Sequence, residues 1–93
     1  MRLSEDEINT IKTVILQHDP AAVIYLFGSR IDDKKQGGDI DILILSANLN
    51  YKEKRKIRIK LHQLLGEQKI DIVIAADNSK PFVKIAMDNG TKL

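Results

Sequence analysis

Apolar residues recur at helical spacing in some segments of this chain and at strand spacing in others. These two spacings predict its helices and strands. A helical spacing of apolar residues follows Ser4, which is placed to be an N-cap, and continues to near His18. A second amphipathic helix is predicted over residues 51–65, and a third over 81–87. The apolar side of the second helix is expected to consist of Ile57, Leu61, Leu64 and Leu65.

Three short segments have the composition of strands. Residues 23–27 and 70–75 are β-branched and apolar runs, which is typical of buried strands. Residues 39–45 alternate strictly, so Asp39, Asp41 and two leucines share one face while three isoleucines share the other. Residues 29–38 are polar and basic, and we expect a short helix or helical turn that leads into an exposed loop.

Length and composition limit the class of protein. The 93 residues are 43% hydrophobic and 30% charged, so one folded domain over residues 1–93 is expected and a strongly disordered chain is excluded. A net charge of +2 is too small for a dedicated nucleic-acid binder. With no cysteine, no signal-peptide pattern and no apolar run long enough to cross a membrane, we expect a cytoplasmic protein.

Two aspartates on one strand face are the first candidate for chemistry. Asp39 and Asp41 are one residue apart, so their Cα atoms should lie about 6.6 to 7 Å apart, and carboxylates so placed can share divalent metal ions. An isolated pair of this kind also fits a solvated strand face. Here the same face continues into leucines, where unpaired charge is unfavourable, and a metal ion would compensate it.

A glycine and a serine directly after the first strand are the second candidate. Gly28 lets a phosphate approach the backbone, and Ser29 adds a hydroxyl, although this dipeptide alone is an ordinary turn. Together with the later glycines and the paired aspartates, it predicts a phosphate cradle beside a metal site. Arg30 could pair with a phosphate or be a solvated helix residue.

A third carboxylate interrupts the aliphatic run over residues 70–75. If this strand lies beside the strand of Asp39 and Asp41, Asp71 reaches the same sheet edge and can ligate a second metal or take a proton from an attacking hydroxyl. The alternative is an edge-strand aspartate that discourages aggregation.

These residues resemble a known family. The series that runs from Phe27 through Gly28, Ser29 and Arg30 to the Gly-Gly-Asp-Ile-Asp of residues 37–41 is similar to the Gly-Ser and Asp-x-Asp signature of the DNA polymerase beta nucleotidyltransferase superfamily. It is most similar to the minimal nucleotidyltransferases that act as antitoxins to HEPN-domain toxins. The resemblance implies an α/β domain of the two-layer α+β kind, with a small mixed sheet flanked by helices.

The resemblance also assigns roles to residues. It implies that Asp39, Asp41 and Asp71 are catalytic and bind two Mg²⁺ ions, and that the nucleotide is bound at the positions Gly28, Ser29, Arg30 and Gly38. Many relatives have a serine where this chain has Gly38. The glycine removes one hydroxyl near the phosphates without moving the carboxylates, so metal binding should survive.

The activity implied by the resemblance is transfer of AMP from ATP to a tyrosine hydroxyl of a HEPN ribonuclease toxin, which makes the chain the antitoxin of a type VII system. Two alternatives stay open: a catalytically weak or inactive antitoxin that neutralises its toxin by binding alone, and transfer to a small molecule or an RNA end.

The helix over residues 51–65 is basic in its first ten residues. Such a run fits a solvated face, or a docking surface for an acidic partner or RNA. Only Tyr51 is available nearby for stacking on bases, which argues against direct nucleic-acid recognition. We expect His62 to pack or face solvent, and His18 to interact with the helix dipole at the end of the first helix.

Overall fold

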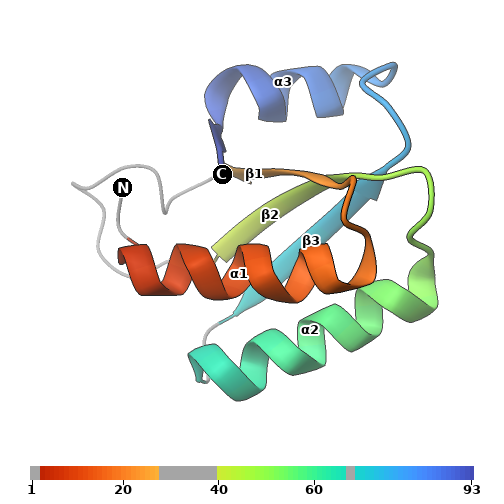
Figure 1. Ribbon diagram of the computed structural model, residues 1–93. Coiled ribbons are helices and arrows are strands. Elements are labelled where there is room, and N and C mark those ends of the chain that lie inside the picture. The colour runs from red at the N-terminus through yellow and green to blue at the C-terminus, as the bar shows by residue number, and fades with distance from the viewer. Residues whose placement is uncertain (1–2, 28–39, 67–68) are drawn as a thin grey trace.

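The computed structural model describes residues 3–27, 40–66 and 69–93 (Figure 1). In chain order the elements are α1 (Glu5–His18), β1 (Val23–Phe27), β2 (Ile40–Leu45), α2 (Tyr51–Leu65), β3 (Ile70–Ala75), α3 (Pro81–Asn89) and β4 (Thr91–Lys92). The predicted α/β class with a small mixed sheet is confirmed. The helix or turn expected within residues 29–38 lies outside the described residues.

The four strands form one sheet in the order β3-β2-β1-β4. Strand β1 is antiparallel to β2 and to β4, whereas β2 and β3 are parallel. Because parallel neighbours need a crossover connection, α2 leaves the end of β2 and returns the chain to the start of β3. Helices α1 and α2 lie on one face of the sheet, and α3 lies on the other (Figure 1).

The alternation along the strands divides the core between these two faces. Between the sheet and the helices α1 and α2, the fully buried aliphatic side chains are Ile11, Ile15, Leu26, Ile40, Ile42, Ile44, Ile57 and Leu61. On the opposite face, Leu43 packs with Val83 and Ala86 of α3. Leu64, which was expected on the apolar side of the second helix, is 53% exposed and lines the groove between α1 and α2.

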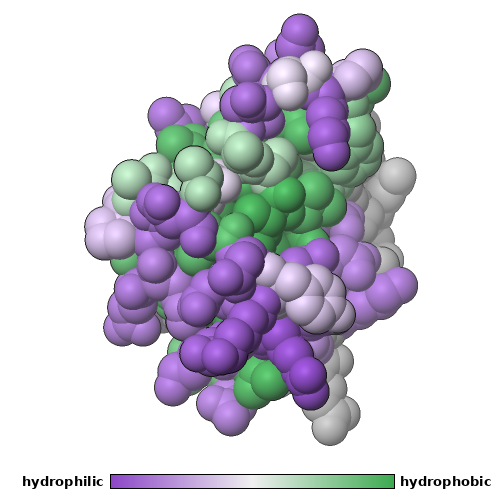
Figure 2. Space-filling model, turned by 90° about the vertical axis from the view of Figure 1, so that its right-hand side faces the viewer, coloured by the Kyte–Doolittle hydropathy of each residue, from purple (hydrophilic) through white to green (hydrophobic). Residues whose placement is uncertain are grey.

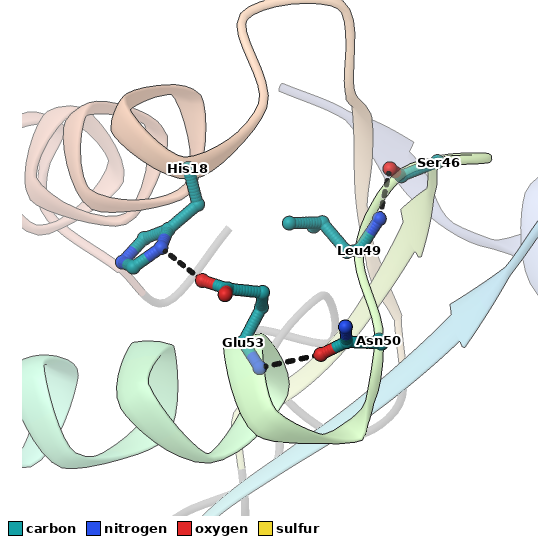
Figure 3. Close-up of polar contacts among 5 residues, drawn as sticks. All are labelled: His18, Ser46, Leu49, Asn50 and Glu53. Carbon is teal, nitrogen blue, oxygen red and sulfur yellow. Dashed lines mark hydrogen bonds and ion pairs between the residues drawn. The ribbon is translucent and has the colours of Figure 1, made fainter.

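Local hydrogen bonds explain where α1 and α2 begin and how they meet. Ser4 and Glu7 form a capping box, as the sequence predicted, and the Asn50 side chain accepts from the Glu53 amide at the start of α2. His18 Nδ1 lies 2.8 Å from Glu53 Oε2, so the end of α1 is joined to the first turn of α2 (Figure 3). His18 ends α1 as expected, and it additionally makes this contact between helices.

Two buried polar residues hold the loops at one end of the sheet. The Asp19 carboxylate accepts hydrogen bonds from the Ser46 hydroxyl and from the Ala21 amide. The Ser46 oxygen in turn accepts from the amides of Asn48 and Leu49, each at 3.1 Å. Figure 3 shows the bond from Leu49. These bonds tie the α1–β1 turn to the β2–α2 connection, and they satisfy polar groups that would be costly to bury unpaired.

The Asp19 contacts predict a pH-dependent stability. The hydrogen bond from the Ser46 hydroxyl, followed by that from the Ala21 amide, lowers the pKa of Asp19 in the folded state. Stability from this group is therefore present above its unfolded pKa of about 4 and is lost as the pH falls through the lower folded value. Asp19→Asn should be less stable than the wild type at about pH 7, with a smaller difference at about pH 3, as measured by urea unfolding. An equal difference at both pH values would contradict this role for the charge.

Candidate functional site

Asp41 and Asp71 are neighbours on adjacent strands. Asp41 lies in β2 and Asp71 in β3, and the parallel register pairs their Cα atoms directly. Neighbouring strands are about 4.8 Å apart, so side chains that leave the same face at one register position lie close together. The expectation that the Asp71 strand lies beside the Asp41 strand is confirmed.

Both aspartates are on the face of the sheet that α3 partly covers. Two residues further along each strand, Leu43 and Val73 belong to the core beneath α3, and strand alternation places Asp41 and Asp71 on that same face. Asp41 is half-buried and Asp71 is exposed. The pair therefore lies where the apolar face ends, with one carboxylate open to a ligand from solvent.

The end of β1 completes the described surroundings of Asp41. Phe27, the last residue of β1, is the Cα partner of Asp41 across the antiparallel pair. Its ring meets that of Phe82 in α3 edge to face, with centroids 6.0 Å apart and planes at 80°. Along the sequence, β1 is followed directly by the Gly-Ser dipeptide that the sequence analysis assigned to phosphate binding.

Gly90 sets the position of α3 over this face. A Cβ atom at Gly90 would lie 2.5 Å from the carbonyl oxygen of Ala86 and 2.8 Å from that of Leu26. Both atoms are backbone and cannot move aside, so only glycine allows the end of α3 to approach β1 this closely. The spacing between α3 and the strand next to Asp41 thus depends on this residue.

Five of the predicted site residues lie outside the described part of the chain. They are Gly28, Ser29, Arg30, Gly38 and Asp39. Their assignments to nucleotide and metal binding stay predictions. Of the predicted catalytic residues, the structure brings together Asp41 and Asp71.

The chemistry of this pair suits a hard divalent cation. Mg²⁺ prefers carboxylate oxygens and is usually bound in proteins by one or two carboxylates together with substrate phosphates. Within the described ranges no group of three or more His, Cys, Asp or Glu side chains could hold a metal ion. Asp41 and Asp71 by themselves would offer such an ion two carboxylates, and it would need further oxygen ligands, such as those of a triphosphate.

The sequence pattern did not signal the contact between Phe27 and Phe82. These rings are far apart along the chain, and no local pattern links Phe27 at the end of β1 to Phe82 in α3. Neither His18 nor His62 is near the carboxylate pair: His18 contacts Glu53, and His62 is exposed on α2.

No helix among the described residues is long and apolar enough to span a membrane.

Comparison with known families agrees with this arrangement. The family model described as polymerase beta, nucleotidyltransferase matches residues 9–93, which is most of the chain. A search of curated proteins found no match.

Proposed function

The chain belongs to the polymerase beta nucleotidyltransferase family, and we propose that it transfers the AMP group of ATP to a hydroxyl group of another molecule. The observation that carries this proposal is the register that sets Asp41 beside Asp71 at the open end of one sheet face. Two carboxylates in that position suit the charge and geometry of a bound metal–triphosphate.

The proposed reaction needs only ATP and the acceptor hydroxyl as reactants. The acceptor oxygen attacks the α-phosphorus of ATP, and the bond from that phosphorus to the bridging oxygen breaks, so pyrophosphate leaves with both electrons. Asp71, which is exposed, is the candidate to accept the hydroxyl proton or to ligate a metal. Two Mg²⁺ ions held by Asp39, Asp41 and Asp71 would offset the negative charge of the phosphates.

The remaining assignments concern the nucleotide. We propose that Gly28, Ser29, Arg30 and Gly38 contact the triphosphate, with backbone amides and the serine hydroxyl as donors. The glycine at position 38 leaves the carboxylate of the following residue in place, so the site should bind metal without a hydroxyl there.

As acceptor we propose a tyrosine hydroxyl of a HEPN-domain toxin, with this chain as the antitoxin. The composition supports a partner of some kind, because only 4% of the residues are aromatic and the chain has no tryptophan with which to enclose a base. In such a hetero-complex the partner would supply part of the base pocket and would present the acceptor.

Mass spectrometry of the two proteins together tests this function. The chain is co-purified with a HEPN-domain protein of the same genome and incubated with ATP, with and without Mg²⁺. We expect one or more AMP units on a toxin tyrosine, only when Mg²⁺ is present, and none when the chain carries Asp41→Asn.

Other outcomes separate the parts of the proposal. A stable complex that silences the toxin without modifying it would contradict transfer and favour neutralisation by binding alone. Full-rate modification of a free nucleotide or an RNA end by the isolated chain would contradict the antitoxin assignment while leaving nucleotidyl transfer in place.

A further inference from the structure

The outer edge of β3 is one of the two edges of the sheet that the described residues form. Strand β3 is at the end of the strand order, next to β2. In its second half Val73 and Ile74 are half-buried, although their register partners in β2, Leu43 and Ile44, are fully buried. An exposed apolar edge of this kind is a template for pairing with another strand.

An apolar hollow lies beside this edge on the α3 side. It has a volume of about 470 Å³, and its apolar walls include Val73 and Ala75 of β3 and Phe82 and Val83 of α3. The connection between these elements adds Asp77, Ser79 and Lys80 to its lining. Phe82 is 53% exposed there. Figure 2 shows hydrophobic surface gathered below α3 at this end of the molecule, with hydrophilic surface over α2 beneath it. The hollow is large enough for more than one apolar side chain.

A second, smaller hollow lies on the α2 side of the same edge. Its volume is about 260 Å³, and Tyr51, Lys54 and Ile74 are among its lining residues. Ile74 also borders the larger hollow, so the two are adjacent across the edge of β3. Lys54 is the charged residue among the described residues that line it.

We propose that the β3 edge binds an extended segment of a partner protein, in which apolar and acidic residues alternate. In an added strand successive side chains point to opposite faces, so every second residue would face the apolar hollow beside Phe82. The residues between them would face the α2 side, where Lys54 favours a carboxylate. A second copy of this chain fits less well, because pairing two β3 edges would bring the α2 sides of both copies, each with Lys54, toward one another.

This binding site goes beyond the proposed transfer reaction and does not involve its carboxylates. Its probe is a synthetic peptide of alternating valine and glutamate, compared with a peptide of the same composition in two blocks and with one of alternating valine and lysine. Binding to the ¹⁵N-labelled full chain is followed by NMR. We expect saturable shifts at the amides of residues 72–76, and at least about tenfold weaker binding of both comparison peptides.

Three variants make the test specific. Phe82→Ala removes a wall of the apolar hollow and should weaken binding of the valine–glutamate peptide about tenfold. Lys54→Glu should reverse the preference, so that the valine–lysine peptide binds more tightly. Lys60→Glu makes the same charge change elsewhere on α2, beside the groove between α1 and α2, and should leave the preference unchanged.

The proposal would be overturned by any of three results. The first is the absence of saturable binding up to about 1 mM peptide. The second is equal binding of the blockwise peptide, since side-chain alternation would then not matter. The third is a shift of the β3 amides with protein concentration alone, which would identify a second copy of the chain as the occupant.

Discussion

Asp71→Asn is expected to lower the rate of nucleotidyl transfer by at least about a hundredfold, because asparagine can neither accept the hydroxyl proton nor ligate a metal as a carboxylate does. Its side chain is exposed, so the change should leave the fold intact. The rate is measured as AMP incorporation into the acceptor protein, alongside circular dichroism and a thermal melt of the variant.

A matched substitution separates this effect from a general loss of negative charge. Asp88→Asn removes a carboxylate from the exposed side of α3 and should retain the wild-type rate. Wild-type turnover in Asp71→Asn would show that Asp71 is not catalytic. The alternative interpretation, an edge-strand aspartate that discourages aggregation, would then hold.

Leu26→Ala should destabilise the chain by about 2–5 kcal/mol. Leu26 is fully buried at the centre of the sheet, where its register partners are Ile42 in β2 and Thr91 in β4. Truncation leaves a cavity between the sheet and the helices α1 and α2 that cannot close easily. Domains of this kind are stable by only about 5–15 kcal/mol, so the change removes a large fraction of the free energy of unfolding. Urea unfolding of the variant and the wild type measures this loss.

Leu64→Ala is the matched control for that prediction. It makes the same change on α2 at a side chain that is 53% exposed, and its cost should be within about 0.5 kcal/mol. Equal losses in the two variants would contradict the placement of the core between the sheet and the helices α1 and α2.

Local pattern was enough to predict most elements and the face of the aspartates. The alternation over residues 39–45 correctly separated Asp41 and the leucines from the isoleucines, because side-chain direction in a strand depends only on position parity. The N-cap at Ser4 and the end of α2 at residue 65 were predicted as well, because helix ends depend on residues within one turn. The residues predicted to hold the phosphates lie outside the described ranges and stay predictions.

The features that sequence analysis missed depend on residues distant in the chain. The contacts of Asp19 with Ser46 and of His18 with Glu53 arise only once α1 has packed beside α2. Strand β4 has two residues, too few for a recognisable pattern, and was not predicted. Exposure of Leu64 likewise follows from how α2 lies against the sheet, which helical periodicity alone does not determine.

Titration of the ¹⁵N-labelled chain with Mn²⁺ and a non-hydrolysable ATP analogue tests most directly whether Asp41 and Asp71 form a metal–nucleotide site. Paramagnetic broadening should centre on the amides of residues 40–42 and 70–72, and it should disappear in the Asp41→Asn, Asp71→Asn double variant. Broadening in the wild type that centres elsewhere, for example on the groove between α1 and α2, or that persists unchanged in the double variant, would contradict the site.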